Sequence, residues 1–211
     1  MIETVVKVGG SLLAAAELPG LLAVLAELAP TRRLAVVPGG GPFADAVRQA
    51  CAVHDPGPSP AHWMAILAMD QHAHLITALL PAARLVASPR EIAEAAEEGL
   101  LPVLSPFRWL READPLPHGW HVTSDSIAAW VAARLSARRL VLLKSLDGVA
   151  GADGKLLPEA TLSSAALAGI VDEGFARAVE PGLECWVVNG REPQRLAELL
   201  RDGRTRGTRL R

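Results

Sequence analysis

The stretch Val5-Val6-Lys7-Val8-Gly9-Gly10-Ser11-Leu12-Leu13 decides how the rest of the chain is interpreted. Its first half is apolar and β-branched apart from one lysine, which favours a buried strand. Glycines at the end of a strand let backbone N–H groups approach an anion, and a lysine there adds positive charge beside a phosphoryl group. The stretch therefore predicts a strand followed by a phosphate-binding turn. The competing interpretation is a tight turn without a ligand, because the spacing matches neither the Walker A motif nor the dinucleotide-binding motif.

A second glycine turn follows in Val36-Val37-Pro38-Gly39-Gly40-Gly41-Pro42-Phe43. Here another apolar run ends in three glycines, and the last proline suits the first turn of a helix. In open α/β sheets, ligands bind beyond the carboxyl ends of the strands. We expect the two glycine turns to face one another across one ligand at that edge. The alternative is that they are two unrelated turns.

Short β-branched runs alternate with longer stretches rich in alanine and leucine along the chain. This alternation is typical of parallel strands joined by helices, so we predict an α/β fold. Strands are expected at Thr4–Val8, Leu34–Pro38, Arg84–Ala87, Leu101–Leu104, Leu140–Lys144 and Glu184–Val188. Helices are expected at Leu21–Ala29, Pro42–Val53, Ala61–Leu80, Pro89–Glu98, Ser126–Ser136, Ser163–Gly169 and Pro193–Leu200.

Three segments interrupt the alternation. A rigid loop is expected over Asp55–Pro60, because proline lacks an amide donor and restricts the residue before it. Pro106–His121 holds three prolines, two tryptophans and two histidines, and is expected to be irregular. Such a loop either lines a site or covers a sheet edge. The Asp153-Gly154 pair predicts a β-hairpin turn.

The composition limits the classes of protein to which the chain can belong. Half of the residues are hydrophobic and 21% are charged, which excludes a disordered chain. The 21 basic and 23 acidic residues give no overall field for a nucleic acid or a membrane surface, so neither is expected as a partner. Cys51 and Cys185 are too few for a disulfide scaffold and lack metal-ligand spacing. Without a signal peptide or a membrane-spanning run, we expect one cytoplasmic domain over residues 1–211.

Two further motifs lie in the C-terminal half. Val122-Thr123-Ser124-Asp125-Ser126 precedes an apolar helix. Asp125 is therefore either a surface residue of a helix cap or a buried carboxylate that orients a lysine ammonium or an acceptor hydroxyl. Leu142-Leu143-Lys144-Ser145-Leu146-Asp147-Gly148-Val149 then places a lysine at another strand end. Two of the three lysines in the chain, Lys7 and Lys144, thus end predicted strands.

In this order and at this spacing, the four motifs resemble those of the amino acid kinase family. The resemblance runs from Val5 to the segments Val187-Val188-Asn189-Gly190 and Gly207-Thr208, nearly the whole chain. It implies a three-layer αβα sandwich with a mainly parallel central sheet. It also implies an ATP-dependent kinase that uses Mg²⁺ and transfers the γ-phosphoryl group to a carboxylate or a phosphate. The acceptor would bind to the N-terminal half, about residues 1–120, and the nucleotide to the C-terminal half, about residues 121–211.

The resemblance implies a role for each matching residue. Lys7 would stabilise the transferring phosphoryl group, and Asp125 would orient a catalytic lysine. The expected contacts to the nucleotide and its phosphates are Gly9, Gly10, Ser11, Lys144, Ser145, Asp147 and Gly148. The glycines expected to cradle the acceptor are Gly39, Gly40 and Gly41.

The chain departs from the family pattern in its C-terminal half. Many family members carry a second catalytic lysine there, yet no lysine follows Lys155. Arg177 in Gly174-Phe175-Ala176-Arg177, Lys144 and a histidine all remain candidates for that charge. The missing lysine keeps open a nucleotide-binding module without transfer activity.

The segment that follows the proline loop carries the candidate acceptor contacts. His62, Asp70 and His72 lie on one predicted helix, where a carboxylate pairs with an amine and a histidine binds phosphate. Core packing is the alternative for each.

Within the family, the chain most resembles the small kinases of methanofuran and methylofuran biosynthesis. The resemblance lies in Ala61-His62-Trp63-Met64-Ala65-Ile66 and Val171-Asp172-Glu173-Gly174-Phe175. These kinases convert (5-(aminomethyl)furan-3-yl)methyl phosphate to its diphosphate. Isopentenyl phosphate and UMP are the alternative acceptors, and the family implies a homodimer or a higher homo-oligomer.

Overall fold

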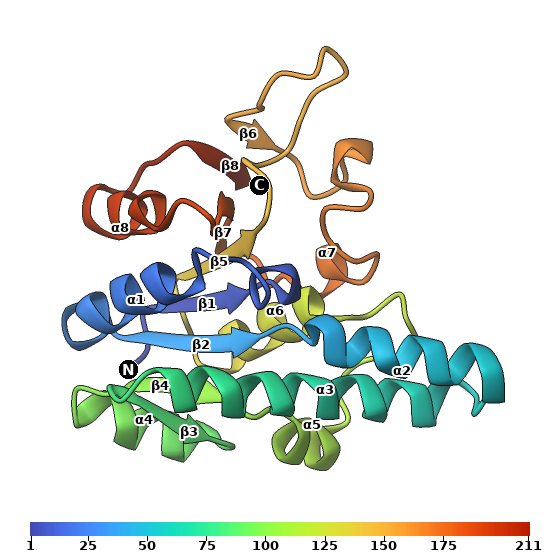
Figure 1. Cartoon of the computed structure of the whole chain (residues 1–211). Helices are drawn as coiled ribbons and strands as arrows, with labels where there is room; N and C mark the ends of the chain where they lie inside the picture. Colours follow the sequence, from blue (N-terminus) through green and yellow to red (C-terminus); the bar gives the residue numbers. More distant parts are fainter.

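Eight strands form one sheet in the order β3-β4-β2-β1-β5-β7-β8-β6 (Figure 1). The computed structural model describes residues 1–211. The strands are β1 Thr4–Val8, β2 Leu34–Pro38, β3 Ala83–Val86, β4 Leu101–Leu104, β5 Arg139–Lys144, β6 Glu159–Ala160, β7 Glu184–Asn189 and β8 Gly207–Leu210. Strand β1 lies at the centre, parallel to β2 and β5. The β7–β8 pair is antiparallel and the other pairs are parallel, which confirms the mainly parallel sheet.

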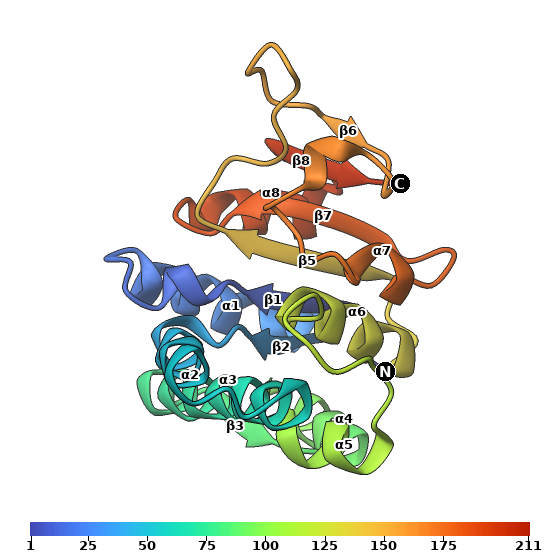
Figure 2. The ribbon, with the colours of Figure 1, turned by 90° about the vertical axis from the view of Figure 1, so that its right-hand side faces the viewer.

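Helices cover both faces of the sheet and give it three layers (Figure 2). Helices α1 and α8 pack on one face in a cluster of 24 buried residues, and α6 packs on the other in a cluster of 25. The helices are α1 Leu18–Arg32, α2 Gly41–His54, α3 Pro58–Leu79, α4 Pro89–Glu97, α5 Phe107–Ala113, α6 Ser124–Arg134, α7 Phe175–Ala178 and α8 Pro193–Asp202. None of these helices has the length and apolar character required to cross a membrane.

The alternation of side chains along β1 and β5 decides where the two strand-end lysines project. Val6 and Val8 pack with α1 and α8, whereas Val5 packs on the opposite face, with α6. Successive side chains of a strand point to opposite faces, so Lys7 projects on the α6 face. By the same rule Lys144, which follows Leu142 by two residues on β5, projects on that face too. The sheet therefore brings both ammonium groups beneath the start of α6.

Two expectations about proline-rich segments are corrected. Helix α3 begins at Pro58 within the predicted rigid loop, because proline is tolerated in the first turn, where the missing N–H has no partner in any case. The segment Pro106–His121, expected to be irregular, contains α5 over Phe107–Ala113. Its prolines lie before and after that helix, so they bound it rather than prevent it.

The C-terminal half differs more from the prediction. The helix expected at Ser163–Gly169 is only a single 3₁₀ turn over Ala165–Leu167, and strands β6 and β8 were not expected. Both strands are short, with β6 at the sheet edge and β8 next to it, and so brief a run leaves little periodic signal. The predicted hairpin turn is confirmed, because an antiparallel bridge joins Ala150 and Leu156.

Candidate functional site

A buried carboxylate between two ammonium groups lies at the centre of the site. Lys7 Nζ lies 2.9 Å from Asp125 Oδ1, and Lys144 Nζ donates a 2.6 Å hydrogen bond to Oδ2. Asp125 and Lys7 are only 3% and 4% exposed. Each carboxylate oxygen of Asp125 thus faces one ammonium group. Of the alternatives for Asp125, the structure shows the buried carboxylate that orients lysines.

Two positive charges around one negative charge shift the pKa values of this cluster. Burial alone would raise the pKa of Asp125, but the ammonium groups of Lys7 and Lys144 together hold it below its usual range. The pKa of Lys144 falls from 10.5 to about 8, first because the amine is buried and next because Lys7 is close. Asp125 is therefore ionised at neutral pH, and the cluster keeps one net positive charge beside the glycine turns.

Asp172 holds the first turn of α6 and so fixes the position of Asp125. Its Oδ2 accepts hydrogen bonds from Thr123 N at 2.9 Å, Thr123 Oγ1 at 2.8 Å and Ser126 N at 3.0 Å. Its Oδ1 accepts a hydrogen bond from Ser126 Oγ. The bonds to Thr123 N and Ser126 N satisfy N–H groups at the start of the helix, as a capping side chain does. Sequence reasoning missed this role, because the cap comes from a residue 49 positions away from Thr123.

The two glycine turns touch one another directly instead of lying on opposite sides of a ligand. Gly39 N donates a 2.8 Å hydrogen bond to Val8 O, which joins the two strand ends. A Cβ at Gly10 would lie 2.3 Å from Gly41 N, and one at Gly39 would lie 2.7 Å from Gly10 N. Glycine is required at both positions because any side chain would collide with backbone. The contact between the two turns leaves no space for a ligand between them, so that expectation is corrected. A ligand at these turns lies above their common edge.

The residues expected to contact the nucleotide fall into two groups. Ser11 Oγ donates a 3.3 Å hydrogen bond to Ser145 Oγ, so the first glycine turn and the end of β5 lie side by side. Asp147 instead accepts hydrogen bonds from Asn189 Nδ2, Arg195 Nη1 and Arg206 Nη2 at 2.8, 2.8 and 2.9 Å. The hydrogen bonds from Asn189 and Arg195 lower the pKa of Asp147.

Gly148 also has a packing role. Its φ of +148° lies in the region that favours glycine, and a Cβ there would approach Thr208 Oγ1 to 2.6 Å. Asp147 and Gly148 thus tie the loop after β5 to β7, α8 and β8. The Asp147 carboxylate is already hydrogen-bonded within the protein.

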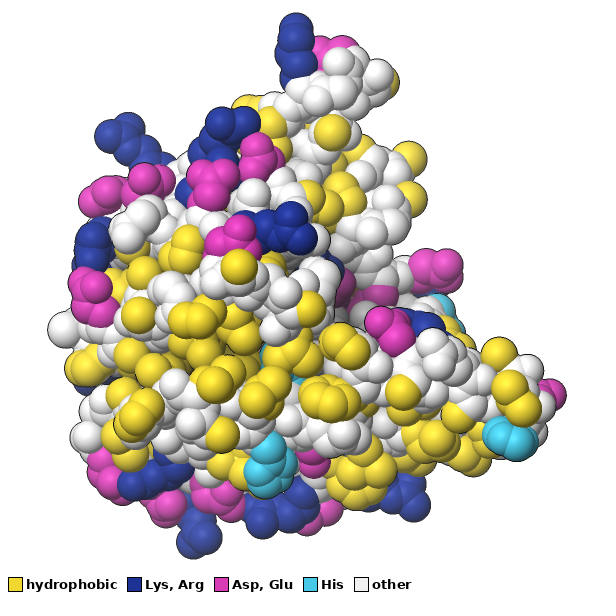
Figure 3. Space-filling model, in the orientation of Figure 1, with side chains coloured by type: hydrophobic (Ala, Val, Ile, Leu, Met, Phe, Trp, Pro, Cys, Tyr) yellow, Lys and Arg dark blue, Asp and Glu magenta, His cyan; other side chains and the backbone are white.

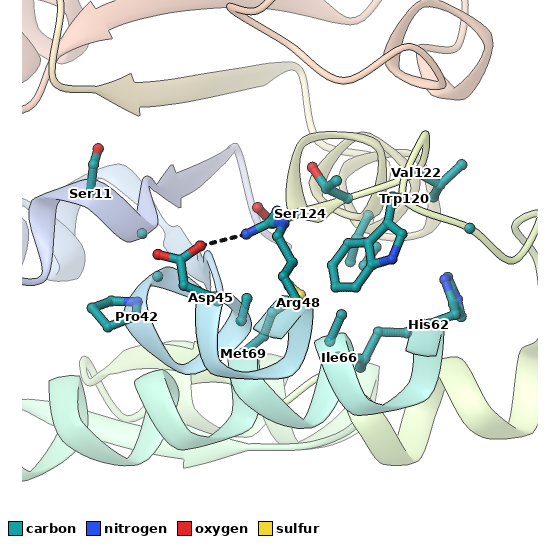
Figure 4. A pocket seen from close by; sticks show the side chains of 18 of the residues that line it. Ser11, Pro42, Asp45, Arg48, His62, Ile66, Met69, Trp120, Val122 and Ser124 are labelled. Atoms are coloured by element: carbon teal, nitrogen blue, oxygen red, sulfur yellow. Dashed lines mark hydrogen bonds and ion pairs between the residues drawn. The ribbon is translucent and has the colours of Figure 1, made fainter. Parts of the chain in front are cut away.

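A cavity of about 370 Å³ opens beside the glycine turns, between α2, α3, the start of α6 and the segment before α6 (Figure 4). Its volume lies within the range of small-molecule sites. Ile66, Met69 and Ile127 give it an apolar floor, and Gly40 and Gly41 form one end. Polar side chains reach the cavity from the turn after β1, from α2, from α3 and from the start of α6. The complete lining is Gly10, Ser11, Ala14, Gly40, Gly41, Pro42, Ala44, Asp45, Arg48, His62, Ala65, Ile66, Met69, Gly119, Trp120, Val122, Thr123, Ser124 and Ile127.

Of the three helix residues expected to bind the acceptor, only His62 lines the cavity. Burial and the neighbouring His118 lower the pKa of His62 to about 4, so the ring is neutral at pH 7. His118 stacks on it with ring centroids 4.5 Å apart. A neutral ring accepts or donates one hydrogen bond but gives a phosphate no charge.

The other two helix residues, His72 and Asp70, do not line the cavity and instead bond to backbone groups of neighbouring segments. His72 is fully buried, and its Nδ1 donates to Gly39 O at 2.5 Å, which fixes the second glycine turn. Asp70 Oδ1 accepts a 3.1 Å hydrogen bond from Phe107 N at the start of α5. Burial raises the pKa of Asp70. The expected acceptor contact at Asp70 is corrected, because this carboxylate lies outside the cavity and caps a helix.

Sequence reasoning missed several residues that do line the cavity. Asp45 and Arg48 lie three positions apart, and therefore on the same side of α2, just after the second glycine turn. Trp120 comes from the segment expected either to line a site or to cover a sheet edge, and it does line the cavity. A polar pair on one side of a helix that follows a glycine turn was the available signal for Asp45 and Arg48.

Comparisons with known proteins show what the chain is similar to. A family model described as "Amino acid kinase family" matches residues 3–189. The [5-(aminomethyl)furan-3-yl]methyl phosphate kinase of Methanocaldococcus jannaschii is 28% identical over 93% of this chain and 92% of its own length. The acetylglutamate kinase of Granulibacter bethesdensis is 33% identical over 42% of this chain and 28% of its own length.

Solved structures show the same fold. The uridylate kinase of Archaeoglobus fulgidus superposes with a TM-score of 0.78 at 18% identity, covering 100% of both chains. The UMP kinase of Ureaplasma parvum superposes with a TM-score of 0.77 at 16% identity, covering 100% of this chain and 99% of its own.

Proposed function

Because the chain belongs to the amino acid kinase family and is a phosphotransferase, we propose that it transfers the γ-phosphoryl group of ATP to (5-(aminomethyl)furan-3-yl)methyl phosphate, giving the diphosphate. The match along nearly the whole length of a kinase named for this acceptor carries the proposal. The matches to acetylglutamate kinases cover only 42–56% of this chain and 28–42% of the length of those enzymes. A carboxylate acceptor is therefore the second candidate.

The lysine pair has the charge that phosphoryl transfer requires. In such a reaction the protein contributes positioning and charge neutralisation, because a phosphate acceptor is already an ionised nucleophile. Lys7 and Lys144, both held by Asp125, would stand beside the transferring phosphoryl group and balance the charge on its oxygens. Lys144 would supply the second catalytic cation, since no lysine follows Lys155. Arg177 is exposed and has no ion-pair partner among the carboxylates.

The nucleotide would bind where the first glycine turn meets the end of β5. Backbone N–H groups of Gly10 and Ser11 and the hydroxyl groups of Ser11 and Ser145 are donors that suit phosphate oxygens, whereas the N–H of Gly9 already donates to Leu143 O at 2.9 Å. No cluster of three or more acidic, histidine or cysteine side chains in the chain is placed to hold a metal ion. Mg²⁺ would therefore be carried by the ATP phosphates, where it neutralises their charge.

The shape and lining of the cavity suit a small phosphate ester with a ring. Its glycine end lies next to the lysine cluster, and its apolar part, Ile66, Met69 and Ile127, accommodates a planar ring. Acetylglutamate offers no ring for this apolar part.

A panel of acceptors tests the proposal. We expect ³¹P NMR of the protein with Mg-ATP to show a new pair of coupled diphosphate signals when the furan phosphate is added. Acetylglutamate, carbamate, isopentenyl phosphate and UMP, each added alone, should give no product. Turnover of acetylglutamate only would contradict the proposed acceptor and favour the carboxylate candidate. ATP binding without turnover of any acceptor would favour a nucleotide-binding module.

We also propose that the chain forms a homo-oligomer through the outer side of α3. Leu67, Leu75 and Leu79 are exposed there, at 42%, 36% and 52%. Figure 3 shows hydrophobic side chains gathered in a band across this face, with charged groups above and below it. Exposed apolar patches of this kind mark interaction surfaces.

Light scattering after gel filtration should give a multiple of 22.2 kDa. Leu75→Glu should shift the mass to the monomer and Val53→Glu, at the end of α2, should not; an unshifted mass for Leu75→Glu would contradict this interface.

A further inference from the structure

Arg48 is the one lysine or arginine that lines the acceptor cavity. The other basic candidate, His62, is uncharged at neutral pH because its pKa is about 4. Lys7 and Lys144 do not line the cavity and share the carboxylate of Asp125. A phosphate ester in this cavity carries close to two negative charges, and Arg48 is the permanent cation available to it.

The position of Arg48 suits a group that waits for an anion. Its Nη1 donates a 2.7 Å hydrogen bond to Asp45 Oδ1, and its Cζ lies 4.8 Å from the centre of the Trp120 ring. In Figure 4 the side chain rises from α2 across the cavity, between Asp45 on one side and Trp120 on the other, toward Ser124. The Arg48 and Asp45 side chains are 51% and 64% exposed. An exposed ion pair of this kind contributes little to stability, so a phosphate can replace Asp45 at small cost.

We propose that Arg48 is the residue that binds the phosphate group of the acceptor and fixes it against the glycine turns. The inference rests on the proposed function, since it requires a phosphate monoester as acceptor. A guanidinium donates two parallel hydrogen bonds to a phosphate, and the Trp120 ring holds its plane across the cavity. Ser124 at the start of α6 lines the same cavity and brings a hydroxyl donor to the same place. Arg48 therefore determines acceptor affinity, whereas the lysine cluster acts on the transferring group.

Variants of Arg48 test this assignment, with a matched control in the same protein. Arg111 also stacks on a tryptophan, with its Cζ 4.8 Å from the Trp63 ring centre, but it does not line the cavity. Arg48→Gln should raise the KM for the furan phosphate by about 10- to 100-fold, the effect of losing charge-assisted hydrogen bonds. Arg48→Lys should recover part of that loss, because it keeps the charge but not the paired donors. Arg111→Gln should leave the KM unchanged.

Further readouts separate acceptor binding from damage to the fold or to the nucleotide site. The KM for ATP should stay within about twofold and kcat should fall less than the acceptor KM rises, because Arg48 acts on binding. Calorimetry with a non-hydrolysable ATP analogue present should show the same loss of furan phosphate affinity. An acceptor KM within twofold of the wild type in Arg48→Gln, or an equal rise in the KM for ATP, would overturn the inference while the proposed function stands. If the wild-type chain turns over none of the phosphate monoesters, the proposed function fails first and the inference with it.

Discussion

Replacing Lys7 by methionine is expected to lower kcat by about 10³-fold, the size of effect seen when a charged group that stabilises a transferring phosphoryl is lost. Methionine keeps the volume of the buried stem and removes only the ammonium group. Asp125 then retains Lys144 as a partner at 2.6 Å, so no buried carboxylate is left unpaired. The fold should therefore survive, and the loss should appear in the chemical step.

The measurement is kcat for the furan phosphate, together with a thermal unfolding curve for each variant. Lys155→Met is the matched control, because Lys155 is exposed and its contact with Asp153 at 3.5 Å is a surface ion pair. The control should keep the wild-type rate. A Lys7→Met protein that is folded and retains more than about a tenth of the wild-type kcat would show that Lys7 does not face the reacting phosphoryl group.

Asp125→Asn is expected to reduce both stability and activity, because it removes the negative charge that lies between two buried ammonium groups. Breaking a buried ion pair from one side costs about 3–5 kcal/mol, which for a chain of this length lowers Tm by roughly 6–20 °C. Lys7 and Lys144 would then repel one another and move apart. We expect kcat to fall by about 10²-fold or more, because both cations lose their position.

The pH dependence gives this variant a separate signature. Burial and Lys7 depress the pKa of Lys144 to about 8, so turnover in the wild-type protein should fall as the pH rises through about 8. The carboxylate of Asp125 opposes that depression, so its removal lowers the pKa further and the alkaline limb of Asp125→Asn should shift to lower pH.

The lowered pKa of Lys144 also determines how the stability of the folded protein depends on pH. A lysine with a depressed pKa in the folded state binds its proton more tightly when the chain is unfolded. Its destabilising contribution is therefore fully present below about pH 8 and fades as the pH approaches 10.5. Rate profiles and unfolding curves over pH 6–10 check both effects. Asp153→Asn, which alters an exposed pair, should change neither, and an unshifted limb in Asp125→Asn would contradict the coupling between these three residues.

Much of the fold could be predicted because its signals are local. The apolar run at Thr4–Val8 and its glycine exit were recognisable without any knowledge of neighbouring strands, and the strand bounds agree. The segment Ser163–Gly169 shows the limit of such signals. It is rich in alanine and leucine, yet it forms one 3₁₀ turn, because it packs outside the sheet as a short connection. Strand β8 was missed for the opposite reason, since its pairing with β7 and β6 is what makes it a strand.

The amino-acid sequence by itself determined the α/β class, the two glycine turns at strand ends and the positions of the lysines that follow from strand periodicity. Only the tertiary structure decided which groups meet. Asp125 pairs with lysines 118 and 19 positions away, Asp70 caps a helix instead of reaching the cavity, and Arg48 meets Trp120 across 72 residues. The physical reason is that periodicity and turn chemistry act over a few neighbouring residues. Burial, ion pairing and pKa shifts depend instead on which distant segments the sheet order and helix packing bring together.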